Sequence, residues 1–193
     1  MKIVIIDYGA GNIKSIQFAL NRLGYEGVLS SSREAIQQAD YVIFPGVGEA
    51  SSAMKKLEIS GLIDLISELK QPVLGICLGM QLMCEYTEEN ETKGLGIFSA
   101  KVRRFGDQVK CPQIGWNTIQ ELRTNLFSGI NEKEYIYMVH SYFAELSPET
   151  IAISNYGNTY SAALQKDNFY GVQFHPEKSG GIGEQILKNF LNV

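Results

Sequence analysis

The sequence Pro-Val-Leu-Gly-Ile-Cys-Leu-Gly-Met-Gln, residues 72–81, gives the strongest indication of the fold. Its first half is an apolar run of the kind that forms a buried strand, and it passes directly into a segment with helical spacing. The apolar runs at 2–6 and 41–44 likewise end in glycine-rich turns that are followed by amphipathic segments. Alternating buried strands and helices predict an α/β fold with three layers, in which helices flank a mostly parallel, doubly wound sheet.

The two halves of the chain differ in their patterns. The first half predicts strands at 2–6, 26–30, 41–44 and 72–76, and helices at 13–23, 33–38, 50–70 (with a break near 60) and 78–85. The second half predicts strands at 101–105, 118–121, 135–139, 151–154, 162–165 and 169–174, and a last helix at 183–191. We expect the later strands to extend the same sheet as antiparallel neighbours and to add a hairpin layer, so that residues 1–193 form one domain.

Composition argues against several classes of function. The 193 residues carry 17 basic and 21 acidic side chains, a net charge of −4 without a basic block, which argues against binding to nucleic acid or to an anionic membrane. Three cysteines without a Cys-x-x-Cys pair and only two histidines argue against a disulfide framework and a metal site. The glycine-rich segment 9–14 departs from a dinucleotide-binding motif at Lys14. We therefore expect neither a metal nor a cofactor.

The N-terminal segment predicts a compartment. Only four uninterrupted apolar residues, 3–6, precede Asp7. This run is shorter than the apolar part of a signal peptide, and far shorter than a helix that crosses a membrane. We expect the protein in the reducing cytoplasm, where cysteines stay unpaired.

Cys77 is the strongest candidate for a chemical role. The segment Gly75–Gly79 matches the Gly-x-nucleophile-x-Gly turn between a strand and a helix, with cysteine in place of serine. Its glycines remove Cβ atoms that would clash in such a tight turn, and the N-terminus of the following helix favours a thiolate. Taken alone, the same segment also fits a buried structural cysteine.

His175 and Glu177 are the candidates for the base and for the group that orients it. Pro176 favours an extended conformation at His175, and residues two apart in an extended chain point to the same side. The Glu177 carboxylate can then accept a hydrogen bond from the imidazole, which orients the ring and stabilises its protonated form. A histidine that only caps the end of a strand is the alternative for this segment alone.

The turn Pro45-Gly46-Val47-Gly48 is the candidate oxyanion site. Acyl transfer needs N–H donors aimed at the developing oxyanion, and we expect these donors from Val47 and Leu78. The glycines on both sides of Val47 also make a flip of its peptide bond cheap, so this half of the site is predicted to be switchable. An ordinary β-turn is the alternative.

Together these segments resemble the class I, triad-type glutamine amidotransferases. Gly75–Gln81, Pro45–Gly48 and Phe174–Glu177 match the motifs of that family in order and spacing. Within the family, the whole chain resembles the glutaminase subunits of imidazole glycerol phosphate synthases. The segments that carry this finer resemblance are Asp7–Asn12, Phe44–Gly48, Gly115–Asn117, Val139–Tyr142 and Phe174–Ser179.

The resemblance implies a substrate, L-glutamine, and a mechanism. Cys77 attacks the side-chain amide, the N–H groups of Val47 and Leu78 hold the oxyanion, and His175 transfers protons with the help of Glu177. Glutamate and ammonia are released. The resemblance also implies further contacts to glutamine, from Gly46, Gly48, Gln81, His140, Ser141 and Tyr142. Among these, His140 is expected to position the substrate rather than to catalyse.

The resemblance further implies a partner. Ammonia passes to a (β/α)8-barrel cyclase that forms a heterodimer with the chain and makes imidazole glycerol phosphate and an aminoimidazole-carboxamide ribotide. The docking face is expected near Tyr8, Asn12, Lys178 and Ser179. Three alternatives remain: the same glutaminase serving a sugar-amidating synthase of surface polysaccharides, a cysteine peptidase or γ-glutamyl hydrolase, and a non-catalytic regulatory module on the same fold.

Overall fold

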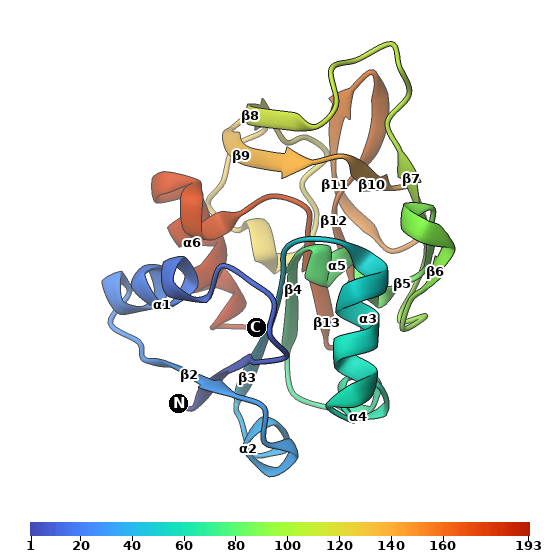
Figure 1. Ribbon diagram of the computed structural model, residues 1–193. Coiled ribbons are helices and arrows are strands. Elements are labelled where there is room, and N and C mark those ends of the chain that lie inside the picture. Colours follow the sequence, from blue (N-terminus) through green and yellow to red (C-terminus); the bar gives the residue numbers. More distant parts are fainter.

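The computed structural model describes residues 1–193 and has a central sheet of 11 strands (Figure 1). The first part of the sheet is parallel, in the spatial order β2-β1-β3-β4-β13. Its strands are β1 (Ile3–Ile6), β2 (Gly27–Ser30), β3 (Tyr41–Gly46), β4 (Val73–Cys77) and β13 (Phe169–Val172). Strands β1, β4 and β13 are buried along their whole length, which explains why their sequences are apolar without alternation.

Strands of the second half continue the sheet beyond β13 in the order β12-β10-β7-β5-β6, and β11 also pairs with β12. Except for the parallel pair β5 and β7, these pairings are antiparallel. The strands are β5 (Cys84–Thr87), β6 (Thr92–Lys93), β7 (Phe98–Arg104), β10 (Tyr142–Ala144), β11 (Thr150–Tyr156) and β12 (Asn158–Lys166). A separate antiparallel pair, β8 (Gln113–Thr118) and β9 (Tyr135–His140), forms the predicted added layer.

Helices cover both faces of the sheet (Figure 1). One apolar core joins Ile3 and Ile5 of β1 to α1 (Ile13–Arg22) and α6 (Gly180–Phe190). The other core joins Val4 and Ile6 to the remaining helices, which are α2 (Arg33–Gln37), α3 (Ala50–Ile59), α4 (Ile63–Glu68) and α5 (Leu78–Met83). Short 3₁₀ helices lie at Glu89–Glu91, Asn125–Phe127 and Pro176–Lys178. The three-layer α/β fold is therefore confirmed.

Two boundaries near the glycine-rich turns differ from the sequence prediction. Helix α5 ends at Met83 instead of residue 85, because Cys84 begins β5 and pairs with Phe98 of β7. Strand β3 continues past residue 44, and its last residue, Gly46, pairs with Cys77 of β4. Both differences come from strand pairing, which local sequence patterns do not encode.

The second half contains further differences. The strand predicted at 118–121 lies at Gln113–Thr118, where each residue pairs with β9, and beyond it only Gln120 forms an isolated bridge. Strands β5, β6 and β10 have no counterpart in the sequence prediction, because each is only 2 to 4 residues long. The last helix begins at Gly180, three residues before its predicted start. None of the helices has the length and apolar character needed to cross a membrane.

Candidate active site

The carboxyl ends of β3, β4 and β13 meet at one edge of the sheet, where α/β folds of this kind bind ligands. A pocket of about 370 Å³ lies there. Of the residues predicted from the sequence, its wall contains Cys77, His175, Val47, Leu78, Gly48, Gln81, His140, Ser141, Tyr142, Asn12 and Lys178. Gly46 and Glu177 are buried next to residues on the wall. Most of the predicted site is thus brought together in one place.

Cys77 occupies the sharp turn where β4 passes into α5. Its φ of 54° and ψ of −112° are strained for a residue with a side chain. A Cβ atom on Gly75 would lie 2.9 Å from the backbone nitrogen of Met80, and one on Gly79 would overlap the backbone oxygen of Phe44. Packing therefore requires the glycine spacing seen in the sequence, and the turn leaves Cys77 on the wall of the pocket.

Two polar groups lie beside the Cys77 sulfur. The thiol donates to the backbone oxygen of Val139, 3.8 Å away, and Nε2 of Gln173 donates to Sγ over 3.7 Å. Gln173 is fully buried and is missing from the predicted site. The signal that points to it is a lone amide within the apolar segment 169–174.

His175 and Glu177 form a buried pair in which Nδ1 of the imidazole lies 2.8 Å from Oε1 of the carboxylate. The sequence predicts this pairing, and His175 has the predicted extended conformation, but the residues after it do not continue as an extended chain. Strand β13 ends at Val172, and a 3₁₀ turn at Pro176–Lys178 brings Glu177 back beside His175. The other carboxylate oxygen, Oε2, is buried without a hydrogen-bond partner, so His175 is the only group that donates to this side chain.

The two histidines on the wall differ in their pKa values. Burial disfavours the protonated imidazole of His175, but the Cys77 sulfur and the Glu177 carboxylate outweigh it and raise the pKa to about 10. At His140 burial dominates and lowers the pKa to about 4, although Nδ1 donates to the Tyr142 backbone oxygen over 2.7 Å. At neutral pH only His175 therefore carries a proton that it can give away.

The turn after β3 lies against the start of α5. A Cβ atom on Gly46 would come within 2.9 Å of the Leu78 Cβ, so the two backbones approach closely. Val47 and Leu78 both line the pocket, and the Val47 side chain is 41% exposed. Gly48 has a φ of +92°, which glycine adopts without strain. This arrangement fits an oxyanion site, and the assignment of the two N–H groups to that role stays a prediction.

Two polar side chains on the wall bear on substrate binding. Gln81 is buried, and its Nε2 donates to the Tyr142 backbone oxygen and to Oε1 of Gln173 over 2.9 and 2.8 Å. Glu89, which the sequence prediction missed, is the only carboxylate on the wall. Burial raises its pKa, and its Oε2 accepts from the N–H of Ala50 over 2.8 Å. No pattern marks Glu89, because it lies in a 3₁₀ helix of only three residues.

The four predicted partner contacts divide into two pairs. Asn12 and Lys178 lie on the wall of the pocket, and docking there stays a prediction. The side chains of Tyr8 and Ser179 are instead buried. The Tyr8 hydroxyl donates to the Pro45 backbone oxygen over 2.8 Å, at the first residue of the Pro45–Gly48 turn. Tyr8 and Ser179 therefore stabilise the loops of the site from inside and offer a partner no side-chain surface.

Ser179 ties the loop that carries His175 to β9. Its hydroxyl donates to the backbone oxygen of His175 over 2.7 Å and accepts from the N–H of Tyr137 over 2.9 Å. The N–H of His175 in turn donates to the Tyr137 backbone oxygen over 3.0 Å. These three hydrogen bonds fix the backbone from which the imidazole enters the pocket.

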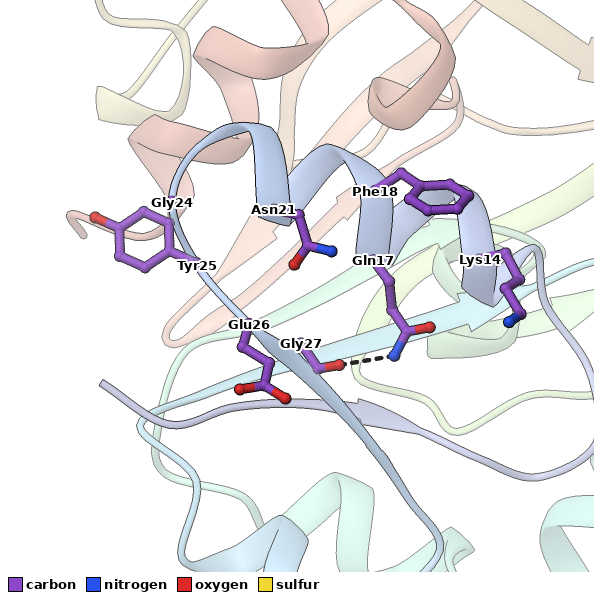
Figure 2. A pocket seen from close by; sticks show the side chains of 8 residues that line it. All are labelled: Lys14, Gln17, Phe18, Asn21, Gly24, Tyr25, Glu26 and Gly27. Atoms are coloured by element: carbon purple, nitrogen blue, oxygen red, sulfur yellow. Dashed lines mark hydrogen bonds between the residues drawn. The ribbon is translucent and has the colours of Figure 1, made fainter.

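A second hollow lies beside α1 and the start of β2 (Figure 2). It is larger, about 640 Å³, but its wall consists only of residues between Lys14 and Gly27. Figure 2 shows the side chain of Gln17 donating to the backbone oxygen of Gly27, over 2.9 Å. The wall contains no cysteine or histidine. Since it lacks a nucleophile and a base, the smaller pocket at Cys77 is the candidate active site.

A cysteine at a strand–helix turn with a buried His–Glu pair nearby defines the class of α/β enzymes that transfer acyl groups through a thioester. Comparison with known families makes the identification more specific. The chain belongs to the class-I glutamine amidotransferase family, whose model matches residues 4–193.

Individual relatives agree with this assignment. The chain is 53% identical to the imidazole glycerol phosphate synthase subunit HisH of Bacteroides fragilis over the full length of both chains. It is 48% identical to the subunit of the same name from Haemophilus influenzae, over 99% of this chain and 97% of that one.

Solved structures agree on the fold. The chain is similar to a putative GMP synthase protein from Thermoplasma acidophilum, with a TM-score of 0.76 and 21% identity over 100% of this chain and 92% of that one. It is also similar to a chain of PurLQS from Thermotoga maritima, with a TM-score of 0.73 and 17% identity over 100% and 99% of the two chains. At these identities the similarity establishes the fold alone.

Proposed function

We propose that the chain is a glutaminase that hydrolyses L-glutamine to glutamate and ammonia, and that it works as the glutaminase subunit of an imidazole glycerol phosphate synthase. The observation that carries this proposal is that Cys77 and the His175–Glu177 pair meet at one pocket. Residues 1–193 act as one domain, which is supported by a family match that spans nearly the whole chain. Three free cysteines support the cytoplasm as its compartment.

The first half of the reaction forms a thioester. The thiolate of Cys77 attacks the side-chain carbonyl carbon of glutamine, and the carbonyl electrons move to the oxygen. The N–H groups of Val47 and Leu78 stabilise this oxyanion. As the oxyanion collapses, the carbon–nitrogen bond breaks and the imidazolium of His175 gives its proton to the departing nitrogen, which leaves as ammonia.

The second half of the reaction restores the enzyme. Neutral His175 takes a proton from a water molecule, whose oxygen attacks the thioester carbon. The carbon–sulfur bond then breaks, glutamate leaves and the thiolate is free again. Throughout, Glu177 holds the Nδ1 side of the ring, so that the other ring nitrogen, Nε2, carries the exchanging proton.

The pocket offers a partner for the charged end of glutamine. The α-ammonium group of the substrate needs an anionic acceptor, and Glu89 is the only carboxylate on the wall. The predicted contacts from Gln81, Ser141 and Tyr142 lie on the same wall, as does Gly48. His140 is neutral at pH 7, so it helps to shape the pocket and does not supply a proton.

The partner uses the ammonia. The (β/α)8-barrel cyclase combines it with a phosphorylated ribulosyl aminoimidazole-carboxamide and releases imidazole glycerol phosphate and the aminoimidazole-carboxamide ribotide, the first of them for histidine biosynthesis. The full-length identity of about half to subunits of this synthase supports the choice of partner. Asn12 and Lys178, both on the pocket wall, are the proposed docking residues.

The alternatives from the sequence are not favoured. A sugar-amidating synthase would use the same glutaminase chemistry, but the relatives described above are subunits of imidazole glycerol phosphate synthase. A regulatory module without catalysis would not need to keep a nucleophile, a base and an orienting carboxylate together. Peptidase or γ-glutamyl hydrolase activity finds no support in the family match.

Reconstitution tests the proposed function. The chain is mixed with its cyclase partner and the aminoimidazole substrate, and imidazole glycerol phosphate is followed with either glutamine or an ammonium salt as the nitrogen source. Wild type is expected to use both sources, and Cys77→Ala only the ammonium salt. Glutamine-dependent product from Cys77→Ala would rule out Cys77 as the nucleophile. Absence of product from the wild type with glutamine would rule out this synthase.

A further inference from the structure

A buried chain of hydrogen bonds runs from the substrate pocket to the back of the nucleophile. Gln81 lies on the pocket wall, and its Nε2 lies 2.8 Å from Oε1 of Gln173. Nε2 of Gln173 lies 3.7 Å from Sγ of Cys77. All three side chains are buried, so water does not compete for these contacts.

The backbone fixes the direction of this series of hydrogen bonds. The oxygen of Tyr142 is a pure acceptor, and it lies 2.9 Å from the amide nitrogen of Gln81. The NH2 group of Gln81 therefore faces both the Tyr142 oxygen and Gln173, and the side-chain oxygen of Gln173 accepts its second hydrogen bond. The NH2 group of Gln173 is then the only part of its amide left to face the sulfur of Cys77. A flipped Gln173 amide would place two donors against each other.

The Cys77 sulfur requires a hydrogen-bond acceptor as a thiol and a hydrogen-bond donor as a thiolate. As a thiol, Cys77 donates to the backbone oxygen of Val139, 3.8 Å away. As a thiolate it has no proton to donate, and the negative end of that carbonyl dipole then faces a negative charge. The NH2 group of Gln173 is the donor from the protein interior that compensates for this.

We propose that Gln173 is a positioning residue that stabilises the negative charge on the Cys77 sulfur, and that Gln81 holds its amide in the required orientation. The inference rests on the proposed function, because it takes Cys77 as the nucleophile. It adds to the triad a third support of the thiolate, besides His175 and the N-terminus of α5. It also gives Gln81 a role within the protein that is independent of any contact with glutamine.

Alkylation of Cys77 tests the proposal without relying on turnover. Gln173→Met keeps the length of the side chain and removes the donor. The rate at which iodoacetamide labels Cys77 at pH 7, followed by mass spectrometry of the Cys77 peptide, is expected to fall about tenfold, since hydrogen bonds to charged groups contribute at least that much. In reconstituted enzyme kcat is expected to fall with little change in KM. Gln165→Met, the same replacement near the opposite end of β13, is the matched control and should label at the wild-type rate.

A second variant covers the case in which Gln173→Met does not fold, which its melting temperature would reveal. Gln81→Met leaves Gln173 in place but frees its amide to rotate, and a smaller fall in the labelling rate is expected. Wild-type labelling of Cys77 in a folded Gln173→Met, or in Gln81→Met where that protein does not fold, would overturn the proposal while Cys77→Ala remains inactive with glutamine. Activity of Cys77→Ala with glutamine would instead refute the proposed function.

Discussion

The two histidines of the chain lie on the wall of one pocket and are about equally buried, with exposed fractions of 6% for His140 and 3% for His175. Each holds its Nδ1 atom against an oxygen of the residue two positions later in the chain. For His140 this is the neutral backbone carbonyl of Tyr142, and for His175 it is the carboxylate of Glu177. The local geometry is therefore the same for both imidazoles, but the accepting oxygen is neutral at His140 and negatively charged at His175.

The consequence is a difference in protonation. Burial lowers the pKa of His140 to about 4, and its other neighbours, the hydroxyl of Tyr160 and the ring of Phe105, carry no charge to oppose this. Burial acts on His175 too, but the Cys77 sulfur and Glu177 raise its pKa to about 10. Burial alone makes a histidine neutral, whereas contacts with the Cys77 sulfur and the Glu177 carboxylate make it an acid that can protonate a leaving group.

The largest effect is expected from exchanging each histidine for glutamine. His175→Gln removes the proton carrier, and glutamine-dependent kcat should fall by about a millionfold, the order seen when the base of a catalytic triad is removed. His140→Gln keeps a donor for the Tyr142 oxygen and should lower kcat only a few-fold. Steady-state assays of both variants in complex with the cyclase measure the contrast.

Turnover with an ammonium salt serves as the control for these two variants, because it bypasses the glutaminase and should stay at the wild-type level. Equal losses of kcat in His140→Gln and His175→Gln would remove the distinction between the two side chains.

Glu177→Gln is expected to have the next largest effect. The amide keeps the shape of the side chain but removes the negative charge, so the pKa of His175 falls and the ring can adopt the wrong tautomer. Loss of the third member of a triad lowers kcat by about 10⁴-fold. A kcat within tenfold of wild type, in a folded variant, would contradict the role given to this carboxylate.

Part of the site can be predicted from local sequence patterns. Cys77 and the His175–Glu177 pair were predictable, because a turn with glycines two residues on either side, and a pair of residues two apart, are local patterns. His175 has the predicted extended conformation, but a 3₁₀ turn rather than a continuing extended chain brings Glu177 to the ring. Local patterns establish proximity better than they establish conformation.

The rest of the site depends on contacts between distant segments. Gln173 acquires its role only because β13 lies beside β4 and because Gln81 faces it from α5. Ser179 follows Lys178 in the sequence and is predicted to face a partner. Its side chain is instead buried, and its hydroxyl accepts a hydrogen bond from the N–H of Tyr137, 42 residues away. Helix α5 stops at Met83 because β5 pairs with β7. Contacts between segments that are distant in the sequence decide all three.

The smallest expected effect concerns the support of the His175 loop. Ser179→Ala leaves the N–H of Tyr137 without its partner and removes one of the two hydrogen bonds to the backbone oxygen of His175, which keeps the one from the N–H of Lys178. The free energy of unfolding, measured in urea, should fall by about 1–3 kcal/mol. Ser31→Ala is the matched control, since Ser31 is exposed, and it should change that free energy by less than about 0.5 kcal/mol. An unchanged stability of Ser179→Ala would show that the loop is held by other contacts.

The difference between His140 and His175 is measured most directly by titrating the two imidazoles with ¹⁵N NMR, since a chain with only two histidines gives two separable sets of signals. In the wild type, His175 is expected to stay protonated up to a pKa of about 10, and His140 to stay neutral down to about 4. In Cys77→Ala the pKa of His175 should fall, because the sulfur is one of the two groups that raise it, while that of His140 stays below 6.5. A His175 that titrates near 6.5 in both proteins would contradict the claim that the Cys77 sulfur and the Glu177 carboxylate raise its pKa.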